Sequence, residues 1–490
     1  MQFYSIYFVS FFTAVFIANY TFAPKYRKYV LFLGSLCFAL SFNLLTLLVL
    51  LCSACLFFYL GKVIGGKHSN MIYLLTFVYV LTAFLLFRYF YAFSDNQILG
   101  LSIYNSNSFL KPVYVASIGL SFYLFQCISY LIEINRQNIK PENNFINFFS
   151  YLAFFPKFIA GPIERPKKFL TQLNYPSEFD YKKVTDGMKI LAWGIFQKFI
   201  LADNLKKVVD AVYYNSDQFP GFIILISIFL FSVEIFADFS GYTYIAIGIS
   251  KMLGISLSEN FHQPYFAPSL REFWNRWHIT LSNWIRDYVF LPVAYKLSRL
   301  QRNDNVTYSV SIMISMILIG FWHGIGWTYI IWGALHGLLL SLSFITNKRR
   351  NKIMQRIGYN RTSKFHNFLR VFITFIIVSF LWVFFRAESL TVVYSLFRGL
   401  TDNWIIDVYS FPRLKNYLSL FGLSRLDIAV IIIGTLLFAG FEIFQSRAKI
   451  LNSIDRLNPV FRWTIYYVLF FSVLFLGSLN KIQNFIYQQF

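Results

Sequence analysis

The sequence predicts an all-α, polytopic integral membrane protein, with about 11 transmembrane helices and additional re-entrant or interfacial helices. Only 13% of its 490 residues are charged, whereas a soluble domain carries about a quarter. The 60 Phe, 33 Tyr and 10 Trp residues exceed what a water-soluble core of this size can bury, but lipid can accept them. Apolar runs of about the 17–25 residues that a helix needs to cross the hydrocarbon layer recur along the chain.

In chain order, the apolar runs differ in length. Residues 29–60 form either one long helix or a hairpin that is broken near Asn43. Several runs are too short to cross a bilayer, which indicates re-entrant segments shielded by protein or by a water-filled cavity. No internal repeat stands out, so we expect residues 1–490 to form a single transmembrane domain. The candidate spans are residues 3–20, 29–60, 71–93, 112–132, 147–160, 188–201, 221–252, 308–321, 326–345, 368–385, 427–445 and 461–478.

The net charge of +22 arises mainly from basic residues in short loops between apolar runs. Such loops are typical of the cytoplasmic side of a membrane, whereas a nucleic-acid-binding domain needs a soluble fold with a basic face. We therefore predict that the loops at 25–28, 165–168 and 348–361 are cytoplasmic. The loops at 94–111 and 388–425, and both termini, are predicted to be extracytoplasmic. The first apolar run has no basic stretch before it, so we expect an uncleaved span.

Three of the six histidines, His278, His323 and His336, lie within 59 residues in or beside apolar sequence. An ionisable side chain at membrane depth is costly, which makes it a candidate for a functional site. The alternative is that each histidine is simply satisfied by a neighbouring helix. The clustering of the three with other polar residues favours a functional site.

Residues 269–288 have the pattern of an amphipathic helix. Arg271, Asn275, His278 and Ser282 recur at steps of four, three and four, which places them on one polar stripe. The tryptophans of this segment lie on a separate side. An interfacial helix would explain the tryptophans and arginines, but it does not call for a histidine in the stripe.

The segment 321–337 contains the other two histidines. Gly324 and Gly326 follow His323 closely, so we expect a helix end or kink that leaves His323 at the mouth of a cavity. In a continuous helix, His336 would lie roughly 140° around the axis from His323, and the two need not share a site.

Glu234 and Asp238 lie one helical turn apart within apolar sequence and are expected to face protein. We interpret them as a buried carboxylate pair that is hydrogen-bonded to a neighbour such as Arg271 or Arg276. A direct catalytic role is the alternative.

Histidines in such a place suit acyl transfer, because a neutral imidazole can take the proton of an attacking hydroxyl. A nearby donor must then stabilise the oxyanion that forms on the thioester carbonyl. A metal or haem site could use the same histidines, but no cysteine or acidic cluster with ligand spacing accompanies them. We expect no bound metal or cofactor.

Several longer motifs follow one another along most of the chain. They are SIGLSFYLFQCISYLIEINR from residue 117, FFPKFIAGPIERPKKFLTQL from 154, ADFSGYTYIAIG from 237, EFWNRWHITLSNWIRDYVFLP from 272, GFWHGIGWTYIIWGALHG from 320, WVFFRAE from 382 and the ending FIYQQF. Together and in this order, these segments resemble the membrane-bound O-acyltransferase (MBOAT) superfamily, specifically its bacterial branch of alginate and other polysaccharide O-acetyltransferases.

The resemblance implies a ring of helices with a central tunnel that joins a cytoplasmic donor to an external acceptor. It implies that His323 of the W-H-G motif is catalytic, and that His278 of the R-W-H motif is its partner, at a position that holds His, Asn or Asp across the superfamily. We add a set of supporting candidates for the site or tunnel: His336, Asn275, Trp322, Asp238 and Arg271.

The resemblance further implies transfer of acetyl groups from cytoplasmic acetyl-CoA, across a bacterial inner membrane, to an extracytoplasmic polysaccharide such as an alginate-like exopolysaccharide or peptidoglycan. A separate SGNH-type acetyltransferase outside the membrane is the expected partner. One alternative is transfer of D-alanine or another acyl group from a carrier protein to a cell-envelope polymer. A glycan transporter, with the buried carboxylates and histidines as a proton relay, is a second alternative.

Overall fold

A computed structural model describes residues 3, 5–64, parts of 72–83, 119–176, 178–300, 303–324, 326–357, 363–401, 421–444, 455–477 and 485. Within these ranges every regular element is a helix, which confirms the all-α prediction. Most of the predicted span at 71–93, the loop at 94–111 and the FIYQQF ending apart from Phe485 lie outside the described residues.

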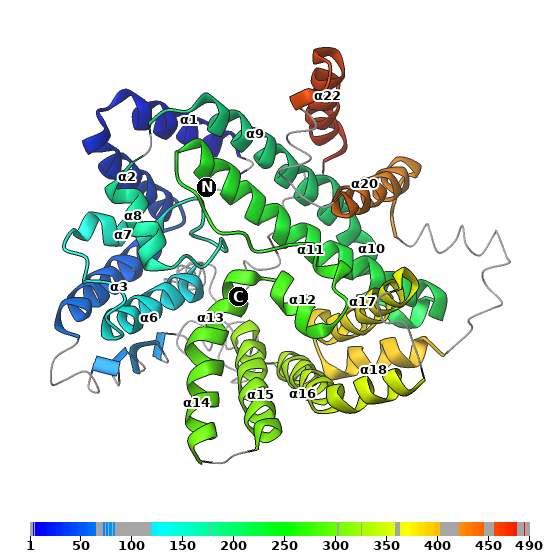
Figure 1. Ribbon diagram of the computed structural model, residues 1–490. Helices are drawn as coiled ribbons and strands as arrows, with labels where there is room; N and C mark the ends of the chain where they lie inside the picture. The colour runs from blue at the N-terminus through cyan, green and yellow to red at the C-terminus, as the bar shows by residue number, and fades with distance from the viewer. Residues whose placement is uncertain are drawn as a thin grey trace, which may run out of the picture. The chain divides into compact units, whose positions relative to one another are not determined.

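The helices are shown in Figure 1. They are α1 (Ile6–Thr21), α2 (Arg27–Leu40), α3 (Leu44–Val63), α6 (Leu120–Asn135), α7 (Phe145–Ala153), α8 (Pro166–Asn174), α9 (Tyr181–Ile195), α10 (Asp203–Tyr214), α11 (Gly221–Met252), α12 (Leu270–Arg276), α13 (Ile279–Ile285), α14 (Leu291–Leu300), α15 (Asp304–His323), α16 (Trp327–Arg356), α17 (Lys364–Arg386), α18 (Leu390–Gly399), α20 (Arg425–Ile443) and α22 (Pro459–Leu476). Two π-helical stretches, η2 (Phe196–Ala202) and η5 (Arg286–Phe290), join α9 to α10 and α13 to α14.

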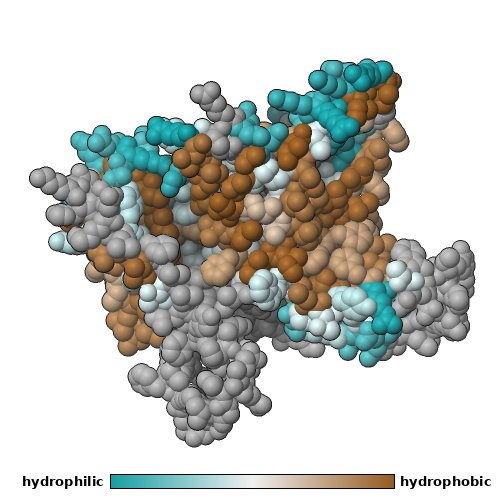
Figure 2. All heavy atoms as spheres, turned by 90° about the horizontal axis from the view of Figure 1, so that it is seen from below, coloured by the Kyte–Doolittle hydropathy of each residue, from teal (hydrophilic) through white to brown (hydrophobic). Residues whose placement is uncertain are grey.

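Seven of the described helices are long and apolar enough to cross a membrane: α3, α11, α15, α16, α17, α20 and α22. Their surfaces suit lipid, since large side chains such as Leu436 on α20 and Phe475 on α22 are 67% and 72% exposed. Figure 2 shows hydrophobic side chains over much of the face that it draws. The protein is thus a multi-pass membrane protein, and the predicted total of about 11 spans stays a prediction.

The chain divides into two compact units. The first comprises Met1–Leu191, Thr243–Ser258 and Tyr487–Gln489, and the second comprises Ala192–Tyr242, Glu259–Ile486 and Phe490. The boundary between Leu191 and Ala192 falls inside α9, and the boundary between Tyr242 and Thr243 falls inside α11. These two helices therefore each contribute to both units. The prediction of a single domain over residues 1–490 stays a prediction.

In the first unit, the apolar run at 29–60 is a broken pair of helices, as one of the two predicted alternatives had it. Asn43 ends the break by capping α3, where its side chain accepts a hydrogen bond from the backbone N–H of Thr46 at 2.6 Å. The helix α7 packs against α2 and α3 through its phenylalanine rings. With nine residues, α7 is about 14 Å long and too short to cross a membrane, so the run at 147–160 is one of the short apolar runs that the sequence predicted, and its re-entrant placement stays a prediction.

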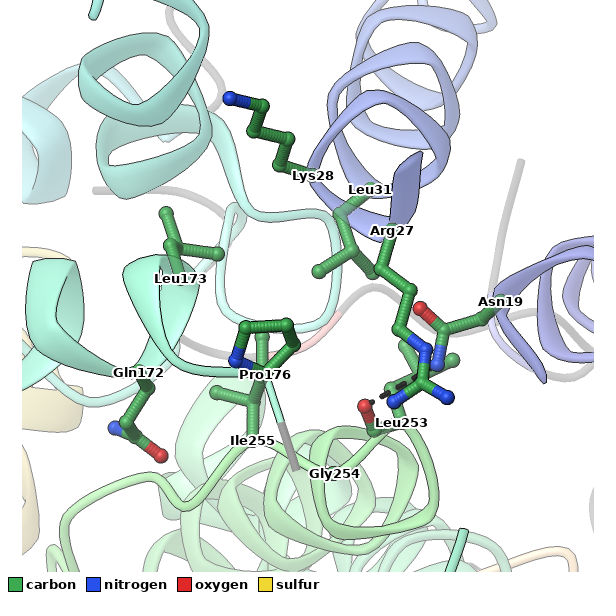
Figure 3. A pocket seen from close by; sticks show the side chains of 10 residues that line it. All are labelled: Asn19, Arg27, Lys28, Leu31, Gln172, Leu173, Pro176, Leu253, Gly254 and Ile255. Carbon is green, nitrogen blue, oxygen red and sulfur yellow. Dashed lines mark hydrogen bonds between the residues drawn. The ribbon is translucent and has the colours of Figure 1, made fainter. Parts of the chain in front are cut away.

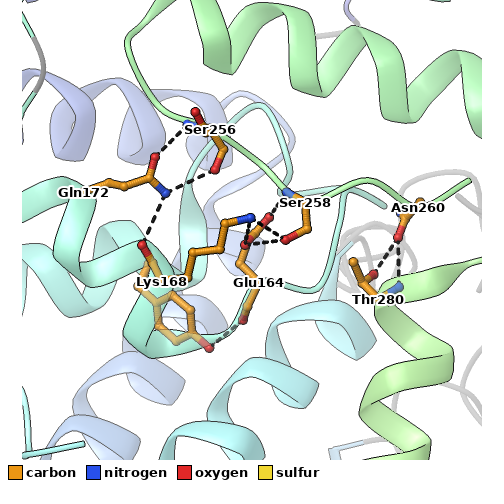
Figure 4. A network of polar contacts seen from close by, with 8 residues as sticks. Glu164, Lys168, Gln172, Ser256, Ser258, Asn260 and Thr280 are labelled. Atoms are coloured by element: carbon orange, nitrogen blue, oxygen red, sulfur yellow. Dashed lines mark hydrogen bonds and ion pairs between the residues drawn. The ribbon is translucent and has the colours of Figure 1, made fainter. Parts of the chain in front are cut away.

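Polar side chains tie α8 of this unit to the segment that follows α11 (Figure 4). Glu164, which is fully buried, accepts hydrogen bonds from the backbone and the hydroxyl of Ser258, and Lys168 donates to the same hydroxyl at 2.8 Å. Gln172 exchanges two hydrogen bonds with the backbone of Ser256, at 2.7 and 3.1 Å. This basic and polar segment is therefore held in a fixed position.

In the second unit, α15 and α16 form an antiparallel hairpin (Figure 1). Gly320 on α15 and Gly333 on α16 permit the close approach, because a Cβ atom at either position would collide with the backbone oxygen of Tyr329 or Met316. The helix α12 packs against α16 and α17, and the fully buried rings of Trp277, Trp332 and Trp382 fill the space between them.

Candidate functional site

The structure gathers His278, His323 and His336 into one aromatic cluster in the second unit. The ring of Trp322 lies 6.4 Å from that of His278 and 4.6 Å from that of His323, measured between centroids. The ring of Trp332 lies 5.4 Å from His323 and 5.1 Å from His336. Two tryptophans thus alternate with the three histidines, and each histidine is at most 2% exposed.

His278 occupies a sharp turn and not the middle of a helix. Its backbone is left-handed, with φ of 41° and ψ of 54°, and it separates α12 from α13. The predicted continuous amphipathic helix over 269–288 is therefore wrong. A single left-handed residue breaks the chain direction, and among non-glycine residues Asn, Asp and His are those most often found in this conformation. His, Asn and Asp are also the residues that the family resemblance implies at the position of His278.

Hydrogen bonds from an extended segment hold this turn on both sides. The backbone N–H of His262 donates to the carbonyl of Arg276 at 3.0 Å, and the N–H of Ile279 donates to the carbonyl of Asn260 at 2.9 Å. The side-chain oxygen of Asn260 also accepts from the hydroxyl of Thr280 at 2.6 Å (Figure 4). Strain in the turn is thus offset by fixed partners, as is common at functional sites.

The turn separates residues that the periodicity placed on one stripe. Arg271 and Asn275 are exposed, and Asn275 donates to the carboxylate of Glu272 at 3.2 Å, whereas His278 is buried. The structure therefore does not bring these two supporting candidates to the histidine cluster. His278 lies outside the seven candidate spans, and burial lowers the pKa of His278 to about 3, so its imidazole is neutral near pH 7.

His323 is the last residue of α15, and α16 begins at Trp327. The predicted helix end at Gly324 and Gly326 is confirmed. Gly324 is required there because a Cβ atom would collide with the ring of Tyr329. The imidazole of His323 lies 4.9 Å from the ring of Phe385 on α17, in addition to its two tryptophan neighbours. His323 is therefore enclosed by aromatic side chains from three helices, and a cavity at this residue stays a prediction.

His336 accepts a hydrogen bond at Nδ1 from the indole N–H of Trp274, with a distance of 3.3 Å. Because an indole nitrogen is only a donor, Nδ1 of His336 carries no proton and Nε2 does. His323 and His336 lie on two different helices, so the angle of roughly 140° that a continuous helix would place between them does not apply. Trp332, four residues before His336 on the same helical face, contacts the rings of both His336 and His323, so the two histidines share this neighbour.

Asp238 is buried as predicted, but its partner is different. Lys198 donates to Asp238 at 2.6 Å and forms a second ion pair with Asp203 at 2.9 Å, and all three side chains are at most 3% exposed. The predicted partners Arg271 and Arg276 are wrong. Lys198 was not among the candidates predicted from the sequence. Its position in the apolar run 188–201, where a charge is costly, is the signal that could have identified it. Glu234 is also buried, and its Oε2 has no hydrogen-bond partner among the described residues.

Arg386 in the WVFFRAE motif is a second residue that the sequence analysis missed. It forms an ion pair with Asp210 on α10, which also accepts hydrogen bonds from Lys206 at 2.8 and 3.0 Å. Because Arg386 directly follows Phe385, this ion pair fixes the end of α17 where Phe385 contacts His323.

The histidine cluster lies within the part of the chain that matches a known protein family. The model of the membrane-bound O-acyltransferase family matches residues 63–387, which include all three histidines, Asp238 and Arg386. The chain is 33% identical over 331 residues to the probable alginate O-acetylase AlgI of Pseudomonas aeruginosa, covering 67% of this chain and 58% of that protein. It is 28% identical over 407 residues to the peptidoglycan O-acetyltransferase of Helicobacter pylori, covering 77% and 74%.

A third relative is the teichoic acid D-alanyltransferase of Streptococcus thermophilus, 31% identical over 279 residues that cover 54% of this chain and 67% of the relative. The chain spans 58 to 62% of the length of the first three alginate O-acetylases that it matches. The family match itself extends over more than half of the chain. This chain belongs to the membrane-bound O-acyltransferase family.

Proposed function

We propose that the protein is an O-acyltransferase that moves acetyl groups from cytoplasmic acetyl-CoA to a polysaccharide outside the inner membrane. The observation that carries this proposal is the buried cluster of His278, His323 and His336 with Trp322 and Trp332, inside the region matched to the acyltransferase family. A site of this kind has titratable bases and excludes water, and both are needed to transfer a thioester-bound acyl group without hydrolysing it.

In the proposed reaction, His323 takes the proton of the acceptor hydroxyl while the hydroxyl oxygen attacks the acetyl carbonyl. The carbon–oxygen ester bond forms, the carbon–sulfur bond breaks, and the proton passes from His323 to the leaving thiolate. His278, neutral near pH 7, is proposed as the partner that positions the acyl group or acceptor. The indole N–H of Trp332 has no hydrogen-bond partner among the described residues, so it can donate to the developing oxyanion.

The proposed acceptor is an alginate-like exopolysaccharide, peptidoglycan or another cell-surface glycan. The relatives from P. aeruginosa and H. pylori support this class, because both are named as O-acetylating enzymes of such polymers. The acceptor hydroxyl belongs either to the polymer itself or to a separate SGNH-type acetyltransferase on the extracytoplasmic side, and in the second case we propose that this partner passes the acetyl group on to the polymer. Both termini are proposed to lie on that side, because the basic loops favour the cytoplasm.

The second candidate function is transfer of D-alanine from a carrier protein to an envelope polymer. The match to the D-alanyltransferase of S. thermophilus favours it, but that match covers 54% of the chain, against 67% and 77% for the O-acetylating relatives. Acetyl transfer is therefore the leading proposal. Glycan transport has no observation in its favour.

A donor competition in inverted membrane vesicles tests this proposal. Vesicles with the wild-type protein, the polymer-synthesis machinery and the extracytoplasmic partner receive either radiolabelled acetyl-CoA or carrier-bound radiolabelled D-alanine. We expect alkali-labile label on polymer from acetyl-CoA only, and none with His323→Ala. Label from D-alanine alone would establish the second candidate. Label from neither donor, with both donors intact in the vesicles, would reject acyl transfer.

A further inference from the structure

A small pocket in the first unit lies between the end of α1, the start of α2, α8 and the turn that follows α11 (Figure 3). Two of its polar side chains contact the protein itself. The side-chain N–H of Asn19 donates to the carbonyl of Leu253 at 3.4 Å, and the guanidinium of Arg27 lies over the ring of Tyr20 at 5.1 Å. The pocket has room for about one water molecule, so it is a packing gap between helices and too small for a substrate.

Phe485, near the end of the chain, lies in the interior of the second unit. It is 5% exposed, whereas no residue of α22, the helix that precedes it, is buried. The ring of Phe485 lies 4.9 Å from the ring of Tyr242 on α11, in an edge-to-face arrangement with an interplanar angle of 80°. The chain therefore returns to the protein interior at Phe485, after a helix that has no buried residue.

The same ring covers the ammonium group of Lys198. The Nζ atom lies 4.5 Å from the centroid of the Phe485 ring, and it forms ion pairs with Asp238 at 2.6 Å and with Asp203 at 2.9 Å. A lysine ammonium has three N–H donors, and the face of an aromatic ring attracts it most strongly where water is excluded. Phe485 thus adds a third contact to a cation that is 1% exposed, and it helps to keep water away from that cation.

The two contacts of Phe485 meet on the turn of α11 that supports His278. The ring of Phe239, on this turn, lies 4.7 Å from the imidazole of His278 in an edge-to-face arrangement. Tyr242 follows Phe239 by three residues, a spacing that makes the two side chains neighbours on one helical face. Asp238, the ion-pair partner of the covered lysine, directly precedes Phe239. Phe485 therefore packs against the part of α11 that contacts His278.

We infer that Phe485 is a positioning residue for acyl transfer, an inference that rests on the proposed function. Its ring packs on Lys198 and Tyr242 and thereby fixes the turn of α11 that holds the imidazole of His278. Loss of the ring would leave the Lys198 ammonium partly uncovered and one side of Tyr242 unpacked. That turn of α11 would then shift, and His278 would lose its fixed neighbour. Phe485 itself touches no reacting atom.

Modification of histidines by diethyl pyrocarbonate, read by mass spectrometry of the purified full-length protein, tests this role without reference to activity. In wild type, His278 and His336 are at most 1% exposed and should react slowly, whereas the exposed His262 should react fast. Phe485→Ala should raise the rate at His278 about tenfold, through loss of the packed ring and its cation–π contact, and leave His336 unchanged. Phe475→Ala is the matched control, because Phe475 on α22 is 72% exposed, and it should react as wild type does.

The rate of acetyl transfer per folded protein is the second readout. Phe485→Ala should lower kcat about tenfold with little change in the KM for acetyl-CoA, the pattern of an interaction made in the transition state. A merely structural role would lower the amount of folded protein and leave kcat as in wild type. Phe485→Leu keeps much of the apolar volume but has no aromatic face, so it should change in the same direction and carries the test where Phe485→Ala fails to fold.

Wild-type reactivity of His278 in both Phe485 variants would overturn the inference, as would a wild-type kcat in variants whose His278 has become reactive. Equal increases at His278 and His336 would also overturn it, because they would show a general loosening of the second unit. Failure of the proposed function gives a different result: the wild-type protein itself then transfers no acetate, while the reactivity of His278 still decides whether Phe485 holds that residue in place.

Discussion

Trp274 donates its indole N–H to Nδ1 of His336 and so joins α12 to α16 within the second unit. The hydrogen bond fixes His336 in the neutral form that carries its proton on Nε2. It also provides an acceptor for the buried N–H of Trp274, so loss of this hydrogen bond lowers stability, an effect separate from the chemistry at His323.

Replacement of His336 tests this structural role. His336→Ala leaves the buried N–H of Trp274 without an acceptor, which costs about 1–3 kcal/mol of folding free energy. His336→Asn keeps an acceptor near the position of Nδ1 and should unfold at a higher temperature than His336→Ala. Thermal unfolding in detergent measures the difference. Equal unfolding temperatures for the two variants would show that this hydrogen bond does not stabilise the protein.

The turn at His278 depends on Asn260. Asn260→Ala removes the acceptor of the Thr280 hydroxyl, and we expect it to cost about 1–2 kcal/mol of stability. Because the turn positions His278, the variant should also transfer less acetate at matched protein level. Thr280→Val removes the donor of the same hydrogen bond and should lower stability by a similar amount. A wild-type rate in Asn260→Ala would mean that the backbone hydrogen bonds alone hold the turn.

The buried imidazole of His278 predicts a stability that depends on pH. Burial lowers the pKa of His278 to about 3, whereas an unfolded histidine titrates near 6.5. Below about pH 6.5 the unfolded chain takes up a proton that the folded chain does not, so stability falls as the pH drops from about 6.5 towards 3. His278→Asn should flatten this part of the curve of unfolding temperature against pH. A curve of unchanged slope would show that His278 is not buried as a neutral ring.

Lys198 forms ion pairs with two buried carboxylates at once. Lys198→Met leaves Asp203 and Asp238 without their cation, and removal of one partner from a buried ion pair costs about 3–5 kcal/mol. We expect little folded protein in the membrane, as measured by fluorescence-detected size exclusion. Lys182→Met is the control, because Lys182 is 69% exposed in its pair with Asp186 and such a pair contributes about 1 kcal/mol or less. Similar yields of the two variants would contradict the role of Lys198.

Hydrophobic patterning predicted the long helices well, because length and apolarity suffice to identify a helix that lipid surrounds. The run at 221–252 coincides with α11, and the glycines after His323 correctly marked the end of α15. The turn at His278 could not be predicted from the sequence pattern, because one left-handed residue does not disturb the alternation of polar and aromatic side chains around it. The partner of Asp238 was missed because Lys198 lies 40 residues away in sequence, and only tertiary structure brings them together.

Polymer-bound acetate shows whether His323 is catalytic. It is released by mild alkali from cells with the wild-type protein, His323→Ala, His278→Ala or His336→Ala at matched protein levels. We predict that His323→Ala abolishes ester acetate, that His278→Ala lowers it strongly, and that His336→Ala retains it. Ester acetate that is unchanged in His323→Ala would contradict the proposed catalytic role of that residue.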